Sequence, residues 1–165
     1  MNNIIYTSQP HDSDVSIGTY CIDPINGSIY IIGRTDYRVS LISINTGKSR
    51  RFKIFAGEFP SPEDCDALVQ AEGVLPLRNG TLEFIQDYNA PYSIGDIFSI
   101  AHGVYMASKI GDVTTMVSLI NGNRYSDDSE SISDMIYGFQ SMGVSISKIP
   151  FNLKLSINPN NVINT

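Results

Sequence analysis

Residues 29–49, IYIIGRTDYRVSLISINTGKS, recur 75 positions later as residues 104–124, VYMASKIGDVTTMVSLINGNR. The two segments align without a gap, apolar residues mostly fall on apolar residues, and Gly47 falls on Gly122. Similarity at a fixed spacing is the sequence signature of a repeated structural unit. The sequence therefore predicts a tandem duplication.

The repeat extends to both sides of this segment. Upstream, residues 16–18 match residues 93–95 at a spacing of 77, so the first copy has two additional residues, in a turn near residues 24–27. The spacing falls along the chain, as deletions in loops require. Downstream, five identities occur at a spacing of 70: Ser61, Asp64, Gln70, Gly73 and Val74 match Ser131, Asp134, Gln140, Gly143 and Val144.

Each copy has the pattern of short strands separated by tight turns. Runs rich in Ile, Val, Tyr and Phe favour strands. Asn-Gly pairs such as Asn26-Gly27 and Asn121-Gly122 tolerate the positive φ that hairpin turns need. In the first copy the sequence predicts strands over residues 18–22, 29–33, 39–44 and 50–55.

A short helix is expected after the strands of each copy. Ser61 is a suitable N-cap, Pro62 fits the first helical position, and Gly73 can end the helix in a left-handed conformation. These signals predict helices over residues 61–72 and 131–142. In the second helix, apolar residues at helical spacing indicate a face packed on the core: Met135, Ile136, Phe139 and Met142.

These elements predict a mainly β fold with minor α, in which two tandem copies of a small SH3-like or OB-like barrel each carry one short helix. Two such small copies are expected to pack on each other, with a groove between them as a natural place for a shared binding site. The predicted boundaries are a flexible segment over residues 1–15, a first copy over 16–86, a second copy over 87–160 and a tail over 161–165.

The composition is that of a folded globular protein, with 42% hydrophobic and 17% charged residues. The net charge of −6 argues against binding nucleic acid through a broad basic surface. Basic residues nevertheless gather in one segment, where they give a local charge of +5: Arg34, Arg38, Lys48, Arg50, Arg51 and Lys53 against Asp36.

The N-terminus lacks the basic and apolar regions of a signal peptide, and no apolar run approaches the roughly 20 residues needed to span a membrane. We therefore expect a cytoplasmic protein without membrane contact. Cys21 and Cys65 are too few for a disulfide framework or a cysteine-rich zinc site, and are expected to be small buried residues.

No catalytic or metal-binding pattern stands out in the sequence. His11 lies in a polar N-terminal stretch and His102 at an expected hairpin turn, and no Ser, Cys or Asp has recognisable triad spacing to them. We expect no enzyme activity, no cofactor and no metal, with an unconventional hydrolase as the remaining alternative. One group of acids lacks calcium-loop spacing and fits a solvated helix entrance: Asp127, Asp128, Glu130 and Asp134.

The candidate binding residues lie in and after the turn that follows the third strand of each copy. Arginine side chains and aromatic rings at such a turn suit phosphates, bases or an acidic partner. Ordinary exposed strand residues are the alternative interpretation. The candidates are Lys48, Arg50, Arg51 and Lys53 in the first copy, and Asn121, Asn123, Arg124 and Tyr125 in the second.

One pattern in the second copy combines Gly95-Asp96-Ile97-Phe98, Tyr105 and the run from Asn121 to Asp127. It resembles small bacteriophage-encoded proteins of unknown function, in which a Gly-Asp-aromatic start and a Gly-Asn-Arg-Trp-Ser-Asp-like ending bracket a β-hairpin region. This chain has Tyr125 where tryptophan is usual, and the first copy keeps less of the pattern. The resemblance implies a phage accessory protein in the host cytoplasm, such as an inhibitor of a host defence or regulatory system.

The first expectation for function is a non-enzymatic binding protein that engages a host protein or sequesters a small anionic ligand. Single-stranded nucleic-acid binding through residues 48–53 is an alternative, because small barrels commonly host it. A structural virion component is a third alternative. A homo-oligomer stays open in each case.

Overall fold

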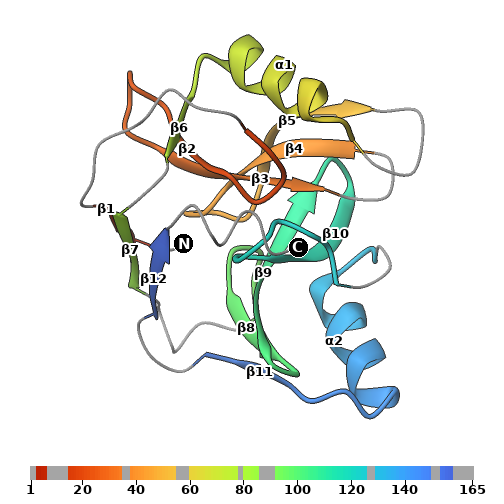
Figure 1. Cartoon of the computed structure of the whole chain (residues 1–165). Coiled ribbons are helices and arrows are strands. Elements are labelled where there is room, and N and C mark those ends of the chain that lie inside the picture. The colour runs from red at the N-terminus through yellow and green to blue at the C-terminus, as the bar shows by residue number, and fades with distance from the viewer. Residues whose placement is uncertain are drawn as a thin grey trace.

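Within its described residues, the chain forms three antiparallel sheets and two helices in a computed structural model (Figure 1). No helix among these residues is long and apolar enough to cross a lipid bilayer. His11 and the predicted tail, residues 161–165, lie outside the description. The described residues are 3–6, 15–34, 38–54, 60–77, 80–85, 92–125, 129–149 and 153–157.

The first sheet contains five strands in the order β5-β4-β3-β2-β6, each antiparallel to its neighbours. The four strands predicted for the first copy are confirmed to within two residues at each described end. The strands are β2 (Tyr20–Ile22), β3 (Ile29–Arg34), β4 (Arg38–Ser43), β5 (Ser49–Ile54) and β6 (Leu75–Leu77).

The second sheet has the order β10-β9-β8-β11. Taking β8, β9, β10 and β11 in place of β2, β3, β4 and β6 turns the order of the first sheet into that of the second. A short bridge from Val117 to Arg124 lies where β4 pairs with β5 through Ile42 and Ser49. The strands are β8 (Ile97–Ile100), β9 (Gly103–Ile110), β10 (Val113–Ser118) and β11 (Ile146–Lys148).

Both predicted helices are confirmed, as α1 (Pro62–Glu72) and α2 (Ile132–Ser141). The backbone N–H of Asp64 donates to the Ser61 hydroxyl at 3.3 Å, and the Asp64 carboxylate accepts from the Ser61 N–H at 2.8 Å. This reciprocal arrangement is a capping box, and it fixes where α1 begins. Gly73 ends α1 with a φ of 66°, as its position predicts.

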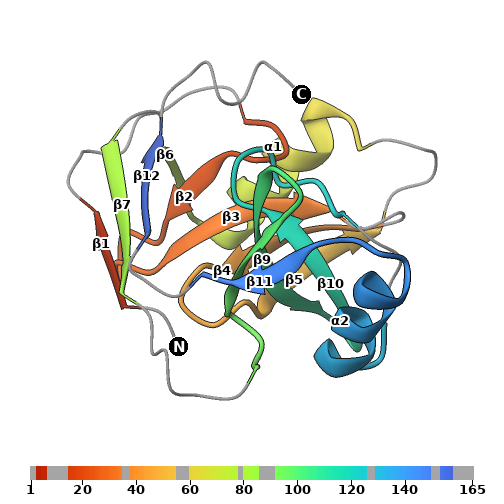
Figure 2. The same ribbon diagram turned by 90° about the horizontal axis from the view of Figure 1, so that it is seen from below.

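A third sheet joins distant parts of the chain, and the sequence did not predict it. Its central strand, β7 (Gly80–Ile85), pairs with β1 (Asn3–Tyr6) on one side and with β12 (Leu153–Ile157) on the other. These three strands lie together at one side of the molecule in two perpendicular views (Figures 1 and 2). Part of the segment predicted to be flexible, residues 1–15, is therefore strand β1.

The first two sheets stack face to face, with one helix on the outer face of each (Figures 1 and 2). In β3, Tyr30 and Ile32 pack with α1, while Ile29 and Ile31 belong to a core shared by both sheets. Residues on alternate faces of a strand point in opposite directions, so β3 is apolar on both faces because both are covered.

The prediction of SH3-like or OB-like barrels is wrong, because the strands form open sheets that do not close into barrels. Each large sheet buries one face against a helix and the other against the opposite sheet, so both apolar faces are covered without closure. The space expected to be a groove between the copies is filled by the shared core. That core includes Ile31, Ile42, Met106 and Val117, all fully buried.

Candidate functional site

Arg50, a predicted binding residue, is held in an ionic cluster on the first sheet. Its Nη1 lies 2.8 Å from Asp23 Oδ2, and its Nε lies 3.1 Å from Glu72 Oε2. The guanidinium also lies over the ring of Tyr30, 5.6 Å from its centroid. Asp23 and Glu72 have side chains only 6% and 5% exposed, so both need this cation as a partner. The cluster therefore ties the β2–β3 turn, β5 and the end of α1 together.

The environment of Asp23 stabilises its ionised form. The backbone N–H of Ile25 donates to Asp23 Oδ1 at 2.9 Å and is the main cause of a lowered pKa. Arg50 lowers the pKa of Asp23 further, whereas burial acts in the opposite direction. Asp23 thus contributes more to stability when it is charged.

Lowering the pH should reduce the free energy of unfolding of the wild-type chain more than that of an Asp23→Asn variant. A carboxyl whose pKa is lowered by folding contributes stability that is complete above its ordinary value of 3.8 and is lost as the pH falls through its value in the folded protein. Urea unfolding measured from about pH 7 down to about pH 2.5 should show this difference below roughly pH 4. The exposed Asp112, changed to Asn, is the control, and equal declines in wild type and Asp23→Asn would contradict the assignment.

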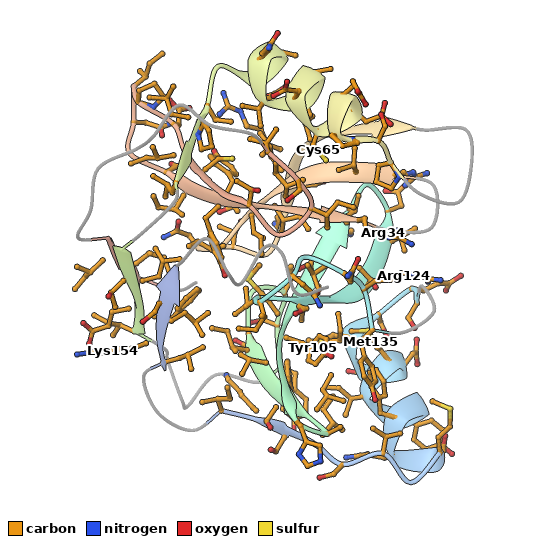
Figure 3. All side chains as sticks on the ribbon, viewed as in Figure 1. Arg34, Cys65, Tyr105, Arg124, Met135 and Lys154 are labelled. Atoms are coloured by element: carbon orange, nitrogen blue, oxygen red, sulfur yellow. The ribbon has the colours of Figure 1, made fainter. Side chains whose placement is uncertain are left out.

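The corresponding place on the second sheet holds an aromatic cluster, defined as Tyr105, Tyr125 and Phe139. The Tyr125 ring lies 5.0 Å from that of Tyr105, edge to face, and 5.4 Å from that of Phe139. Tyr105 belongs to β9 and packs against the core cluster that includes buried residues of α2 (Figure 3). Burial, and then Tyr125, raise the pKa of Tyr105, so its hydroxyl stays protonated. At the repeat spacing of 75, Tyr105 aligns with Tyr30 and Tyr125 aligns with Arg50.

Among the described residues, this second cluster has no ion pairs like those around Arg50. Tyr125 is 39% exposed although two rings hold it in place. The neighbouring helix α2 adds two exposed apolar side chains, Tyr137 at 73% and Met142 at 70%. Met142 falls where the first half has Glu72, so an ion-pairing carboxylate is replaced by a thioether. We call the exposed side chains of Tyr125, Tyr137 and Met142, on and beside α2, the α2 surface. Tyr137 is two positions from buried Phe139, so it projects from the opposite side of the helix.

Comparison of the chain with protein-family models, with curated proteins and with solved structures finds no match. The geometry of the two clusters therefore carries the functional argument.

Of the remaining predicted binding residues, those with described side chains are not brought together by any contact that the structure shows. Lys48 is exposed, and its backbone forms an isolated parallel β-bridge with that of Lys109. Arg51 and Lys53 belong to β5, but their side chains lie outside the description. Asn121 and Asn123 are half-buried in a turn, where Asn121 Oδ1 accepts from the Asn123 N–H at 3.0 Å. Half-buried Arg124 is paired with Val117 next to β10.

The other residues considered for chemistry have structural positions. Cys21 and Cys65 are buried, as predicted, and burial raises the pKa of the Cys21 thiol, which keeps it protonated and unreactive. His102 is exposed in the turn between β8 and β9. Asp134 is in the first turn of α2, where its backbone N–H donates to the hydroxyl of the N-cap Ser131 at 3.1 Å and its carboxylate accepts from that hydroxyl at 2.7 Å. In the described part of the chain, no three His, Cys, Asp or Glu side chains are placed to hold a metal ion, and Asp127 and Asp128 lie outside it.

Sequence reasoning missed the partners of Arg50. Asp23 lies in a turn and Glu72 in the last turn of a helix. Acidic residues at such places are usually exposed, so the sequence does not mark these two as buried partners of an arginine. One signal could have found them: the residues that align with Arg50, Asp23 and Glu72 at the spacings of the predicted repeat are all uncharged, namely Tyr125, Ile100 and Met142. Charges that disappear together are typical of groups that contact each other.

Proposed function

We propose that the chain is a non-enzymatic binding protein that engages a protein partner through the α2 surface. One observation carries the proposal. The same place on the two sheets is closed by ion pairs around Arg50 in the first half, and is left aromatic and partly exposed around Tyr125 in the second.

The chemistry of the α2 surface suits a protein partner. Tyrosine and methionine are enriched at protein interfaces, where a fixed aromatic ring offers a large contact area at a low entropic cost. The Tyr105 and Phe139 rings restrict Tyr125 in this way before any partner binds.

Single-stranded nucleic acid and small anionic ligands are less well supported partners. Arg50, at the centre of the basic segment, already has Asp23 and Glu72 as counter-charges. An anion at this place would have to compete with two buried carboxylates. The net charge of −6 also opposes a broad attraction for phosphates.

The resemblance of residues 95–127 to phage-encoded proteins supports a phage accessory role, with a host protein as the partner. On this proposal the protein acts in the host cytoplasm by occupying a surface of a host defence or regulatory protein. We further propose that the chain arose by duplication. The matching strand orders of the two large sheets and the matching bridges at Ser49 and Arg124 support that history.

Tyr125→Ala should weaken binding of a partner captured from host lysate by roughly 30-fold, the loss expected for an aromatic anchor worth about 2 kcal/mol. Tyr92→Ala is a matched control. Tyr92 is also an exposed tyrosine, 52% accessible, and its ring centroid lies 5.6 Å from that of Phe98. Binding of the purified partner to immobilised full-length variants measures the effect.

The highly exposed Tyr137 provides a variant that tests binding with little effect on folding. Tyr137→Ala should weaken binding of the partner at least threefold while leaving the midpoint of thermal unfolding unchanged. A partner that binds both Tyr125→Ala and Tyr137→Ala like wild type would refute the α2 surface as the binding site. Retention on single-stranded DNA that is lost on raising the salt concentration would instead favour the nucleic-acid alternative.

A further inference from the structure

We infer that the two halves of the chain, residues 1–85 and 92–165, meet through a self-complementary interface of the kind found in twofold homodimers, so that each half presents a surface that fits a second copy of the same unit. None of the α2 surface residues takes part. The contacts between the halves carry this inference, whatever the partner of the α2 surface.

Two backbone hydrogen bonds between the halves are images of each other. The Lys109 N–H donates to the Gly47 carbonyl at 2.8 Å, and the Arg34 N–H donates to the Gly122 carbonyl at 3.1 Å. At the spacing of 75, Arg34 corresponds to Lys109 and Gly47 to Gly122. The donor and acceptor roles are therefore exchanged between the halves, as an isologous contact requires.

The same turns approach the other half too closely for any side chain. A Cβ on Gly47 would lie 2.4 Å from the carbonyl oxygen of Ala107, and a Cβ on Gly122 would lie 2.3 Å from that of Ile32. Ile32 and Ala107 are themselves a matching pair. Both docked turns thus meet the same strand position of the opposite half.

The apolar contact between the sheets repeats this exchange. Ile42 and Val117, which correspond to each other, belong with Ile31 and Met106 to the one core that the two sheets share. The Tyr20 hydroxyl adds a buried hydrogen bond of 2.6 Å to the carbonyl of Leu119 in the other half. The shared core extends to the third sheet, where β12 from the second half pairs with β7 from the first.

Cleavage between the halves tests whether the covalent connection is needed. A protease recognition sequence inserted between Ile85 and Tyr92 of the full-length chain allows the folded protein to be cut once. We expect the cut halves to elute together in size-exclusion chromatography at micromolar concentration, and their unfolding temperature to rise with concentration, as for a two-chain complex. Halves that separate under these conditions would overturn the inference.

A pair of glycine variants isolates the close approach between the halves. Gly122 and Gly27 share a φ of +73°, but a Cβ on Gly27 meets no atom within 4 Å. In the cut protein, Gly122→Ala should raise the dissociation constant of the halves at least tenfold more than Gly27→Ala. Equal effects would show backbone strain alone and would contradict the docked-turn contact.

Tyr20→Phe provides a milder variant should Gly122→Ala prevent folding. It removes the hydroxyl that donates to Leu119 and keeps the ring in the core. We expect a severalfold rise in the dissociation constant of the halves. An unchanged constant would count against the interface as described.

Discussion

Phe84→Ala should lower the free energy of unfolding by about 3–5 kcal/mol, the range for removing a fully buried phenylalanine. Phe84 is fully buried in β7, and it pairs with Ile4 of β1 on one side and with Leu153 of β12 on the other. It also belongs to the core shared by the two large sheets. The cavity left by alanine would therefore open where all three sheets meet.

Urea unfolding at neutral pH measures this effect, and the next residue supplies the control. Ile85 lies on the same strand but is 36% exposed. Ile85→Ala should cost about 1 kcal/mol or less, as is usual for a substitution at a partly exposed site. Similar losses from the two variants would mean that β7 does not pack against the shared core.

Arg50→Ala should lower the midpoint of thermal unfolding by roughly 5–10 °C, since it breaks the ion pairs of two largely buried carboxylates. Asp23 and Glu72 would both lose their ion pair with Arg50, and with it the part of their cover that Arg50 supplies. Arg50 itself is 36% exposed, so water that replaces it offsets part of the loss. The expected fall in the unfolding midpoint is accordingly smaller than that for a fully buried ion pair.

Two further variants define the cause of the Arg50 effect. Lys48→Ala removes an exposed basic residue two positions away and should leave the midpoint nearly unchanged. Arg50→Lys keeps the charge but has a single ammonium where the guanidinium reaches both carboxylates, so an intermediate loss is expected. A midpoint for Arg50→Ala equal to that of Lys48→Ala would exclude a structural role for the cluster.

Local features of the fold could be predicted from the sequence, whereas its closure could not. The Ser61 cap, Pro62 and Gly73 define α1 because helix ends depend on neighbouring residues. Hairpin turns also depend on local residues, which is why strands β2 to β5 were found. Barrel closure depends on which faces are covered, and that is decided by packing between distant elements. The third sheet was missed for the same reason, because β1, β7 and β12 come from three separate parts of the chain.

The candidate site could be predicted only in part. The sequence analysis listed residues 50 and 125 together, as binding residues at corresponding turns. The structure gives them unlike surroundings: Arg50 lies between two acids, and Tyr125 lies between two rings. Both sets of neighbours come from other strands and helices, so single-sequence spacing carries little information about them.

The docked turns at Gly47 and Gly122 also govern where the chain can change in length. Both turns keep the same number of residues between their flanking strand positions, because one more or one fewer would displace a carbonyl that the other half needs. At the spacings of the repeat, the first half has two additional residues in the β2–β3 turn, where Ile25 is 94% exposed and a Cβ on Gly27 would meet no atom within 4 Å. The turn whose length differs between the halves therefore faces solvent, whereas the docked turns have equal lengths.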